Sequence, residues 1–208
     1  MIILPLTLGP LANNTYIVAD PQTSLAAVID PSFEPELILE KAAQAGLRIE
    51  AVWLTHAHFD HIAGVAGLLA GLSPSTTVSL HPADLPLWRE NGGASMFGYH
   101  IDSGPLPALL LQHGQILTLG STSLEVRYTP GHSPGHVVFF AASAGVVFCG
   151  DLIFRRSVGR TDLPGSNTAQ LAESIRTQIY TLTPQIRLLP GHGPETSVGE
   201  ELADNPYV

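Results

Sequence analysis

The chain has 208 residues, of which 45% are hydrophobic and 13% are charged, and its formal net charge is −9 at pH 7. This composition excludes a disordered chain, which is rich in charge and poor in apolar residues, and no apolar run approaches the roughly 20 residues of a membrane-spanning helix. Nine basic residues against eighteen acidic ones leave no basic surface for nucleic acid or for an anionic membrane.

The length fits one domain over residues 1–208. The single cysteine, Cys149, excludes an internal disulfide, and we interpret it as a small buried hydrophobe at a strand end. The first eleven residues are apolar but lack a basic start and contain Pro5 and Pro10, so they indicate a first strand rather than a signal peptide. We therefore expect a cytoplasmic protein.

The first half of the chain predicts strands over 2–8, 15–19 and 25–29, a helix over 36–45, a strand over 51–55, a helix over 61–69, a strand over 76–80 and a short helix over 82–89. A long, glycine-rich connection follows over 91–107, and such connections in compact domains are often functional. The second half predicts strands over 115–119, 123–128, 137–141 and 146–149, a helix over 168–182, a strand over 186–189 and a short C-terminal helix. Strands followed by helices, twice over, predict an α+β sandwich with two sheets between helical layers.

Ligand-type side chains gather in short loops after the predicted strands. His56, His58, Asp60 and His61 lie within six residues. Burying so many polar groups without partners would be unfavourable, and imidazole with carboxylate is the ligand set of zinc, iron or manganese. Three further loops supply the remaining candidates, which are His132, Asp151 and His192.

A competing motif lies in the same region. Residues 131–135 match the G-x-S-x-G nucleophile elbow around Ser133, and Asp151 and His192 follow in the chain order of an α/β-hydrolase triad. The residue after the serine is Pro134, which has no N–H to offer an oxyanion hole. The segment after it is β-branched and aromatic where the elbow requires a helix, so we set the serine-hydrolase interpretation aside.

The motif His56-x-His58-x-Asp60-His61, followed by His132, Asp151 and His192, resembles the metallo-β-lactamase fold superfamily over nearly the whole chain. The segments 129–135, 159–165 and 205–207 look like the small glyoxalase II-like (hydroxyacylglutathione hydrolase-like) branch. The resemblance implies an αββα sandwich of two mixed sheets flanked by helices. Full-size glyoxalase II enzymes carry a further C-terminal helical region that binds glutathione, which we expect to be absent here.

Carried over to this chain, the resemblance implies two divalent metal ions: zinc, iron or a mixture, with manganese as a further candidate. His56, His58 and His132 would hold the first ion, Asp60, His61 and His192 the second, and Asp151 would bridge them. Asp60 and Asp151 would also be catalytic, because their charges offset part of that of the metals. The implied reaction is attack of a metal-bridging hydroxide on the carbonyl carbon of a small-molecule thioester, with glutathione thioesters as candidates, and expulsion of a thiolate.

Candidate substrate residues lie near these ligands in sequence. Phe97, Tyr99 and His100 belong to the connection 91–107, where Met96, Phe97 and Tyr99 would form an apolar wall of the cleft. Arg155, Arg156 and Arg160 follow Asp151 and are suited to a substrate carboxylate; a local ion pair, such as Arg160 with Asp162, is the interpretation we favour for them. His136 matches no ligand position, and we expect it to hydrogen-bond within its loop.

Three other functions compete with a thioesterase. An oxidoreductase resembling the persulfide dioxygenases would use one iron on His56, His132 and Asp151, and a lactonase or other ester hydrolase of the same fold is a further alternative among the hydrolases. A nuclease is disfavoured by the net charge of −9. Metal stoichiometry and oxygen uptake with a persulfide distinguish the oxidoreductase from the hydrolases. The sequence does not determine an oligomeric state.

Overall fold

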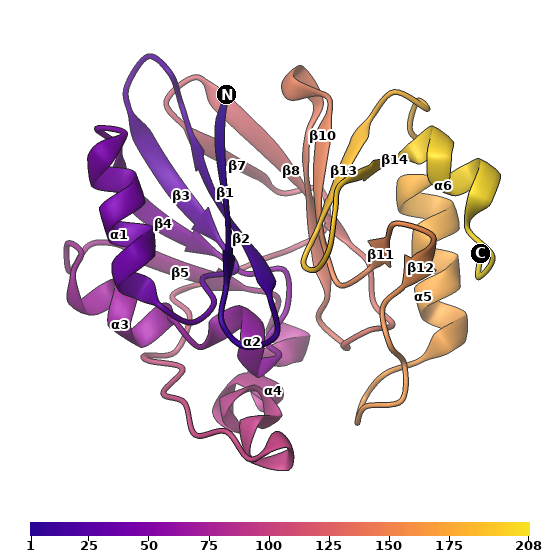
Figure 1. Ribbon diagram of the computed structural model, residues 1–208, viewed down its shortest axis with the longest axis horizontal. Coiled ribbons are helices and arrows are strands. Elements are labelled where there is room, and N and C mark those ends of the chain that lie inside the picture. Colours follow the sequence, from indigo (N-terminus) through magenta and orange to yellow (C-terminus); the bar gives the residue numbers. More distant parts are fainter.

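The computed structural model describes all residues 1–208 and contains two six-stranded mixed sheets packed face to face (Figure 1). The first sheet has the spatial order β1 (Ile2–Leu8), β2 (Asn13–Ala19), β3 (Leu25–Ile29), β4 (Arg48–Trp53), β5 (Thr77–Leu80) and β6 (Leu109–Leu110). The second has the order β14 (Thr196–Ser197), β13 (Arg187–Pro190), β10 (Val146–Gly150), β9 (Val137–Ala141), β8 (Thr122–Tyr128) and β7 (Ile116–Leu119).

Helices cover the outer face of each sheet. Helices α1 (Pro35–Gln44), α2 (Phe59–Ile62) and α3 (Val65–Ala70) accompany the first sheet, whereas α5 (Thr168–Ser174), its π-helical continuation η4 (Ile175–Ile179) and α6 (Val198–Asp204) accompany the second (Figure 1). The helices η1 (Pro82–Asp84), α4 (Leu85–Arg89), η2 (Asn91–Phe97) and η3 (Ala142–Ala144) are short. No helix is both long and apolar enough to cross a membrane. The predicted αββα sandwich is confirmed.

The alternating direction of side chains along the strands explains why the fold has four layers, helices on the outside and two sheets between them. In β3, Ala26 and Val28 join the core under α1 and α3, whereas Ala27 and Ile29 join the core between the sheets. In β10, Phe148 likewise faces the central core and Cys149 faces the α5 side. Successive strand residues point to opposite faces, so apolar side chains on both faces require a layer on each side.

Several local features differ from the predictions. The helix predicted over 61–69 divides into α2 and α3 at Gly64, because the Gly64 N–H donates to the carbonyl oxygen of Pro31 at 3.0 Å and not to the preceding helical turn. The helix predicted over 168–182 changes to a π-helix at Ile175. The connection 91–107 begins with η2, and the small hairpin of β11 (Ile153–Phe154) and β12 (Ser157–Val158) was not predicted.

Candidate metal centre

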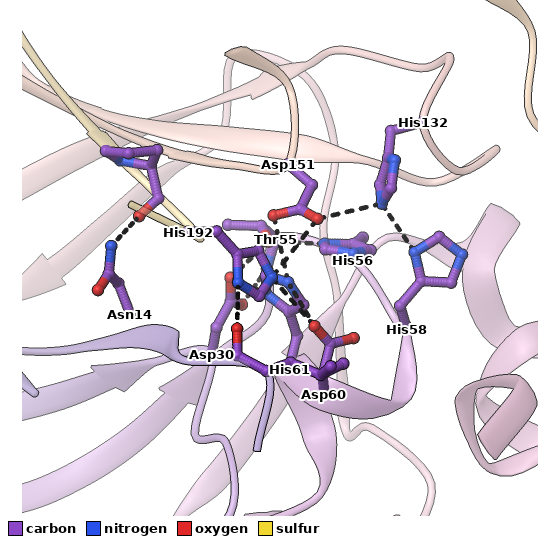
Figure 2. Close-up of polar contacts among 12 residues, drawn as sticks. Asn14, Asp30, Thr55, His56, His58, Asp60, His61, His132, Asp151 and His192 are labelled. Carbon is purple, nitrogen blue, oxygen red and sulfur yellow. Dashed lines mark hydrogen bonds and ion pairs between the residues drawn. The ribbon is translucent and has the colours of Figure 1, made fainter. Parts of the chain in front are cut away.

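The candidate ligands follow strands whose carboxyl ends meet at one edge of the sandwich. The loop after β4 carries His56, His58 and, at the start of α2, Asp60 and His61. His132, Asp151 and His192 follow β8, β10 and β13 of the other sheet. Because β10 and β13 are parallel neighbours, their ends bring Asp151 and His192 together, and the two packed sheets bring both sets face to face (Figure 2).

The first group consists of His56, His58 and His132, whose ligand atoms lie within 4.8 Å of one another. The Nδ1 of His58 is 2.8 Å from the Nε2 of His132. Burial, reinforced by neighbouring imidazoles, lowers the pKa of His56 well below its ordinary value and that of His58 to about 3. These imidazoles are therefore neutral at pH 7, the form in which histidine binds a metal.

The second group consists of Asp60, His61 and His192, again with ligand atoms within 4.8 Å. The Nε2 of His192 is 3.0 Å from Oδ2 of Asp60. Asp151 lies between the groups (Figure 2): its Oδ1 is 3.3 Å from Nε2 of His61, and its Oδ2 is 3.6 Å from Nε2 of His132. One carboxylate thus reaches toward both groups.

The chemistry of these atoms fits bound cations. Nε2 of His56, Nε2 of His61 and Oδ1 of Asp151 are buried and have no hydrogen-bond partner. Each such atom costs about 1–3 kcal/mol if it stays unpaired. Burial opposes protonation of His61, but the carboxylates of Asp151 and Asp60 raise its pKa well above the usual value, so the negative field here favours positive charge. The seven residues would satisfy their buried atoms by holding divalent metals.

Asp30, at the end of β3, belongs to this centre and was missed by the sequence analysis. Its Oδ1 accepts the Thr55 N–H at 2.7 Å, and its Oδ2 accepts the Thr55 hydroxyl at 2.6 Å and lies 3.0 Å from Nδ1 of His61. A carboxylate on Nδ1 fixes the imidazole tautomer and leaves Nε2 free for a metal. The sequence feature that could have identified Asp30 is its position directly after a predicted strand, a position that the candidate ligands share.

Asp84, at the end of η1, is the second residue that was missed. Its Oδ2 accepts the Ala57 N–H at 3.0 Å and the Ser133 hydroxyl at 2.7 Å, and its Oδ1 accepts the Gly135 N–H at 2.6 Å. This buried carboxylate therefore ties the His56–His61 loop to the loop of His132. Ser133 is occupied by that bond and is not arranged as a nucleophile.

His136 makes the loop hydrogen bonds expected for it. Its Nε2 accepts the Asp151 N–H at 3.1 Å, and its Nδ1 is 2.9 Å from the Thr129 hydroxyl. It thereby positions the backbone of a candidate ligand without being one. Cys149 is fully buried at the end of β10, where burial raises the pKa of its thiol, as expected for a small hydrophobe.

A cavity of about 200 Å³ lies over the ligands, lined by Leu11, His58, Phe59, Asp60, Phe97, His132, Asp151, Arg160 and Leu163. Phe97 and Arg160 therefore lie where the sequence analysis expected substrate residues. Arg160 is also paired with Asp162 through hydrogen bonds of 2.7 and 2.9 Å, the local ion pair favoured above.

The other candidate substrate residues lie outside this cavity. Tyr99 and His100 line a separate cavity behind η2, although the Tyr99 ring stacks on Phe59 with 5.1 Å between centroids. Arg155 is exposed in the turn between β11 and β12. Arg156 pairs with Asp204 of α6 at 3.0 Å.

Curated relatives match nearly the full chain. It is 36% identical to the probable metallo-hydrolase YqgX of Bacillus subtilis, over 96% of this chain and 94% of that protein. It is 31% identical to the hydroxyacylglutathione hydrolase GloC of Haemophilus influenzae, over 99% and 96% of the two chains.

Solved structures agree with these relatives. The chain is similar to BLEG-1 B3 metallo-beta-lactamase (TM-score 0.92, 33% identity, 99% of both chains) and to TTHA1623 in a di-iron-bound form (0.89, 42%, 99% and 100%). It is also similar to ETHE1 from Myxococcus xanthus (0.81, 29%, 99% and 84%). The family model of the metallo-beta-lactamase superfamily matches residues 8–192. With this match, the αββα fold and the histidine–aspartate loops at one edge of its sheets, the chain belongs to the metallo-beta-lactamase superfamily.

Proposed function

We propose that the protein is a binuclear metallohydrolase that cleaves a small-molecule thioester. The observation that carries the proposal is the position of the Asp151 carboxylate between the two groups: its Oδ2 is 3.6 Å from Nε2 of His132 in the first group, and in the second group Oδ1 is 3.3 Å from Nε2 of His61 and Oδ2 is 3.8 Å from Nε2 of His192. His56, His58 and His132 would hold one ion, Asp60, His61 and His192 the other, and Asp151 would contact both. The di-iron form of TTHA1623 supports two ions of this kind.

Bound divalent metals supply a water whose pKa falls to about 7 and polarise the substrate carbonyl. The protein's own residues orient the ligands: Asp30 holds His61, His136 holds the backbone of Asp151, and Asp84 joins the loops of both sheets. The His61 imidazole and the loops that carry the other candidate ligands are therefore held in place before substrate arrives, which lowers the reorganisation needed during reaction.

The polar groups that line the cavity favour a thioester over an ester or amide. Apart from the candidate ligands, Arg160 is its only polar lining residue, and a guanidinium cannot donate its proton as a general acid at neutral pH. A thiol has a pKa of about 8.5, so a thiolate leaves without being protonated first. Alkoxide and amide leaving groups are far more basic, and apart from the candidate ligands the cavity lining has no side chain to protonate them. The name of the GloC relative supports the same class.

The test compares metal-loaded protein with protein treated with a chelator, using an acylglutathione thioester and a persulfide. We expect thiol release that depends on metal, without oxygen uptake. Asp151→Ala should abolish release and lower the metal content. Oxygen uptake with the persulfide, supported by one iron, would instead establish the dioxygenase alternative on His56, His132 and Asp151.

A further inference from the structure

A second cavity opens beside the one over the candidate ligands. It also measures about 200 Å³ and is lined by His58, Leu87, Glu90, Gly92, Gly93, Ser95, Met96, Phe97, Leu163 and Pro164. His58, Phe97 and Leu163 line both cavities, so the two are continuous along these side chains. Together they reach the size of small-molecule sites, roughly 300–1,000 Å³.

The wall of this side cavity is built onto the ligand loop. Gly92 has φ +64°, and a Cβ on it would lie 2.3 Å from the backbone nitrogen of Phe59 and 2.7 Å from the carbonyl oxygen of Ala57. The Phe97 ring stacks on the Phe59 ring, with centroids 5.4 Å apart. Both contacts involve residues next to the candidate ligands His58 and Asp60, so the cavity keeps a fixed place beside the metal centre.

The lining is apolar with one charge. Leu87, Met96, Phe97, Leu163 and Pro164 contribute apolar surface, and Glu90 is the only acidic residue in the lining. No cation lines the cavity. Arg160, the only cation in the neighbouring cavity, lies on the metal side. A carboxylate in the side cavity would therefore meet the repulsion of Glu90, whereas the positive charges of Arg160 and of bound metals belong to the neighbouring cavity.

We propose that the side cavity binds the acyl group of the substrate and selects short, uncharged, apolar acyl groups, with Glu90 rejecting acyl groups that end in a carboxylate. This inference rests on the proposed thioesterase function. The apolar walls and the volume suit a chain of a few carbons, whereas an anionic thiol such as glutathione is directed to the side of Arg160. A hydroxide derived from water forms a C–O bond at the carbonyl carbon and the C–S bond breaks, so that the thiolate leaves on the side of Arg160 and the carboxylate product leaves from the side cavity.

The test measures kcat/KM of the metal-loaded protein for acetyl, butyryl and succinyl thioesters of glutathione. Butyryl should exceed acetyl by roughly tenfold, because two further methylenes are buried. Succinyl has the same chain length as butyryl but ends in a carboxylate, and it should fall below butyryl by roughly tenfold. Glu90→Gln should raise the succinyl value roughly fivefold, the effect of one like charge nearby, and should thereby narrow the difference between butyryl and succinyl.

Leu87→Ser should reduce the preference for butyryl over acetyl. The matched control is Leu106→Ser, because Leu106 is 59% exposed and lies outside both cavities. Equal values for butyryl and succinyl, or a Glu90→Gln variant that changes all three alike, would overturn the inference while the thioesterase function stands. No hydrolysis of any of the three would overturn the thioesterase function, and the inference with it.

Discussion

Asp84→Asn tests whether Asp84 holds the metal-ligand loops in place or only stabilises the fold. The aspartate accepts three hydrogen bonds with two oxygens, from Ala57, Ser133 and Gly135. Asparagine has the same shape but only one acceptor oxygen. In one orientation its amide nitrogen faces the Gly135 N–H, and in the other it faces the Ala57 N–H, so at least one donor always loses its partner.

The expected magnitude follows from two opposed effects. A hydrogen bond to a charged group contributes about 1.5–3 kcal/mol. Burial raises the pKa of Asp84, so the neutral amide avoids part of the desolvation that the carboxylate undergoes. We therefore expect the free energy of unfolding to fall by about 2 kcal/mol, which lowers Tm by about 4–8 °C for a chain of this size. Metal affinity should fall roughly 10- to 100-fold, as for other residues that orient ligands.

The assay combines thermal unfolding with metal titration against a competing chelator. Asp102→Asn is the matched control, because that exposed carboxylate only accepts the Gly104 N–H at 2.8 Å. A lower Tm with unchanged metal affinity would mean that Asp84 stabilises the fold without holding the ligand loops in place. An unchanged Tm would refute the hydrogen-bond reasoning itself.

Three further predictions concern other parts of the molecule. Hydrogen bonds from Ser121 and Thr23 lower the pKa of Asp20 in the folded protein. The stabilisation of the fold by ionised Asp20 is therefore complete above the unfolded pKa of about 3.9 and is lost as pH falls below it. Asp20→Asn should make the free energy of unfolding less dependent on pH in this acid range, and an unchanged slope would contradict this. Ser133→Ala should keep most activity and lose about 1 kcal/mol of stability; an inactive variant with full metal content would restore the serine-nucleophile hypothesis. Phe97→Ala should raise KM without changing metal content, and unaltered kinetics would place Phe97 outside the substrate path.

Local patterns predicted the elements well where the apolar period was regular. The strands over 2–8, 25–29 and 137–141 have the bounds expected for them. The break at Gly64 was not predictable, because it depends on a hydrogen bond from the Gly64 N–H to the carbonyl oxygen of Pro31, which lies 33 positions earlier in the chain. The hairpin of β11 and β12 was not predicted, because each strand has only two residues, too few to show the alternation of apolar and polar residues.

In the site, too, residues in local motifs were predictable, and residues that act through distant contacts were not. The dense motif of His56, His58, Asp60 and His61 identified four candidate ligands, and three further loops after predicted strands supplied His132, Asp151 and His192. The structure brings all seven together from both sheets. Asp30 and Asp84 are isolated aspartates in sequence, and their importance comes from partners 25 to 51 positions away. Arg156 shows the converse, since its closeness to Asp151 in the chain does not bring it to the cavity, and its partner is Asp204.

The most direct test of two metals acting on a thioester is metal analysis of reconstituted protein, coupled to thiol release from an acylglutathione thioester. The account predicts about two metal equivalents per chain in the parent, about one in His192→Ala, and hydrolysis that a chelator abolishes and added metal restores. His192 is the ligand to change because it belongs only to the second group, 3.0 Å from Asp60. One tight equivalent in the parent, unchanged in His192→Ala, would contradict it.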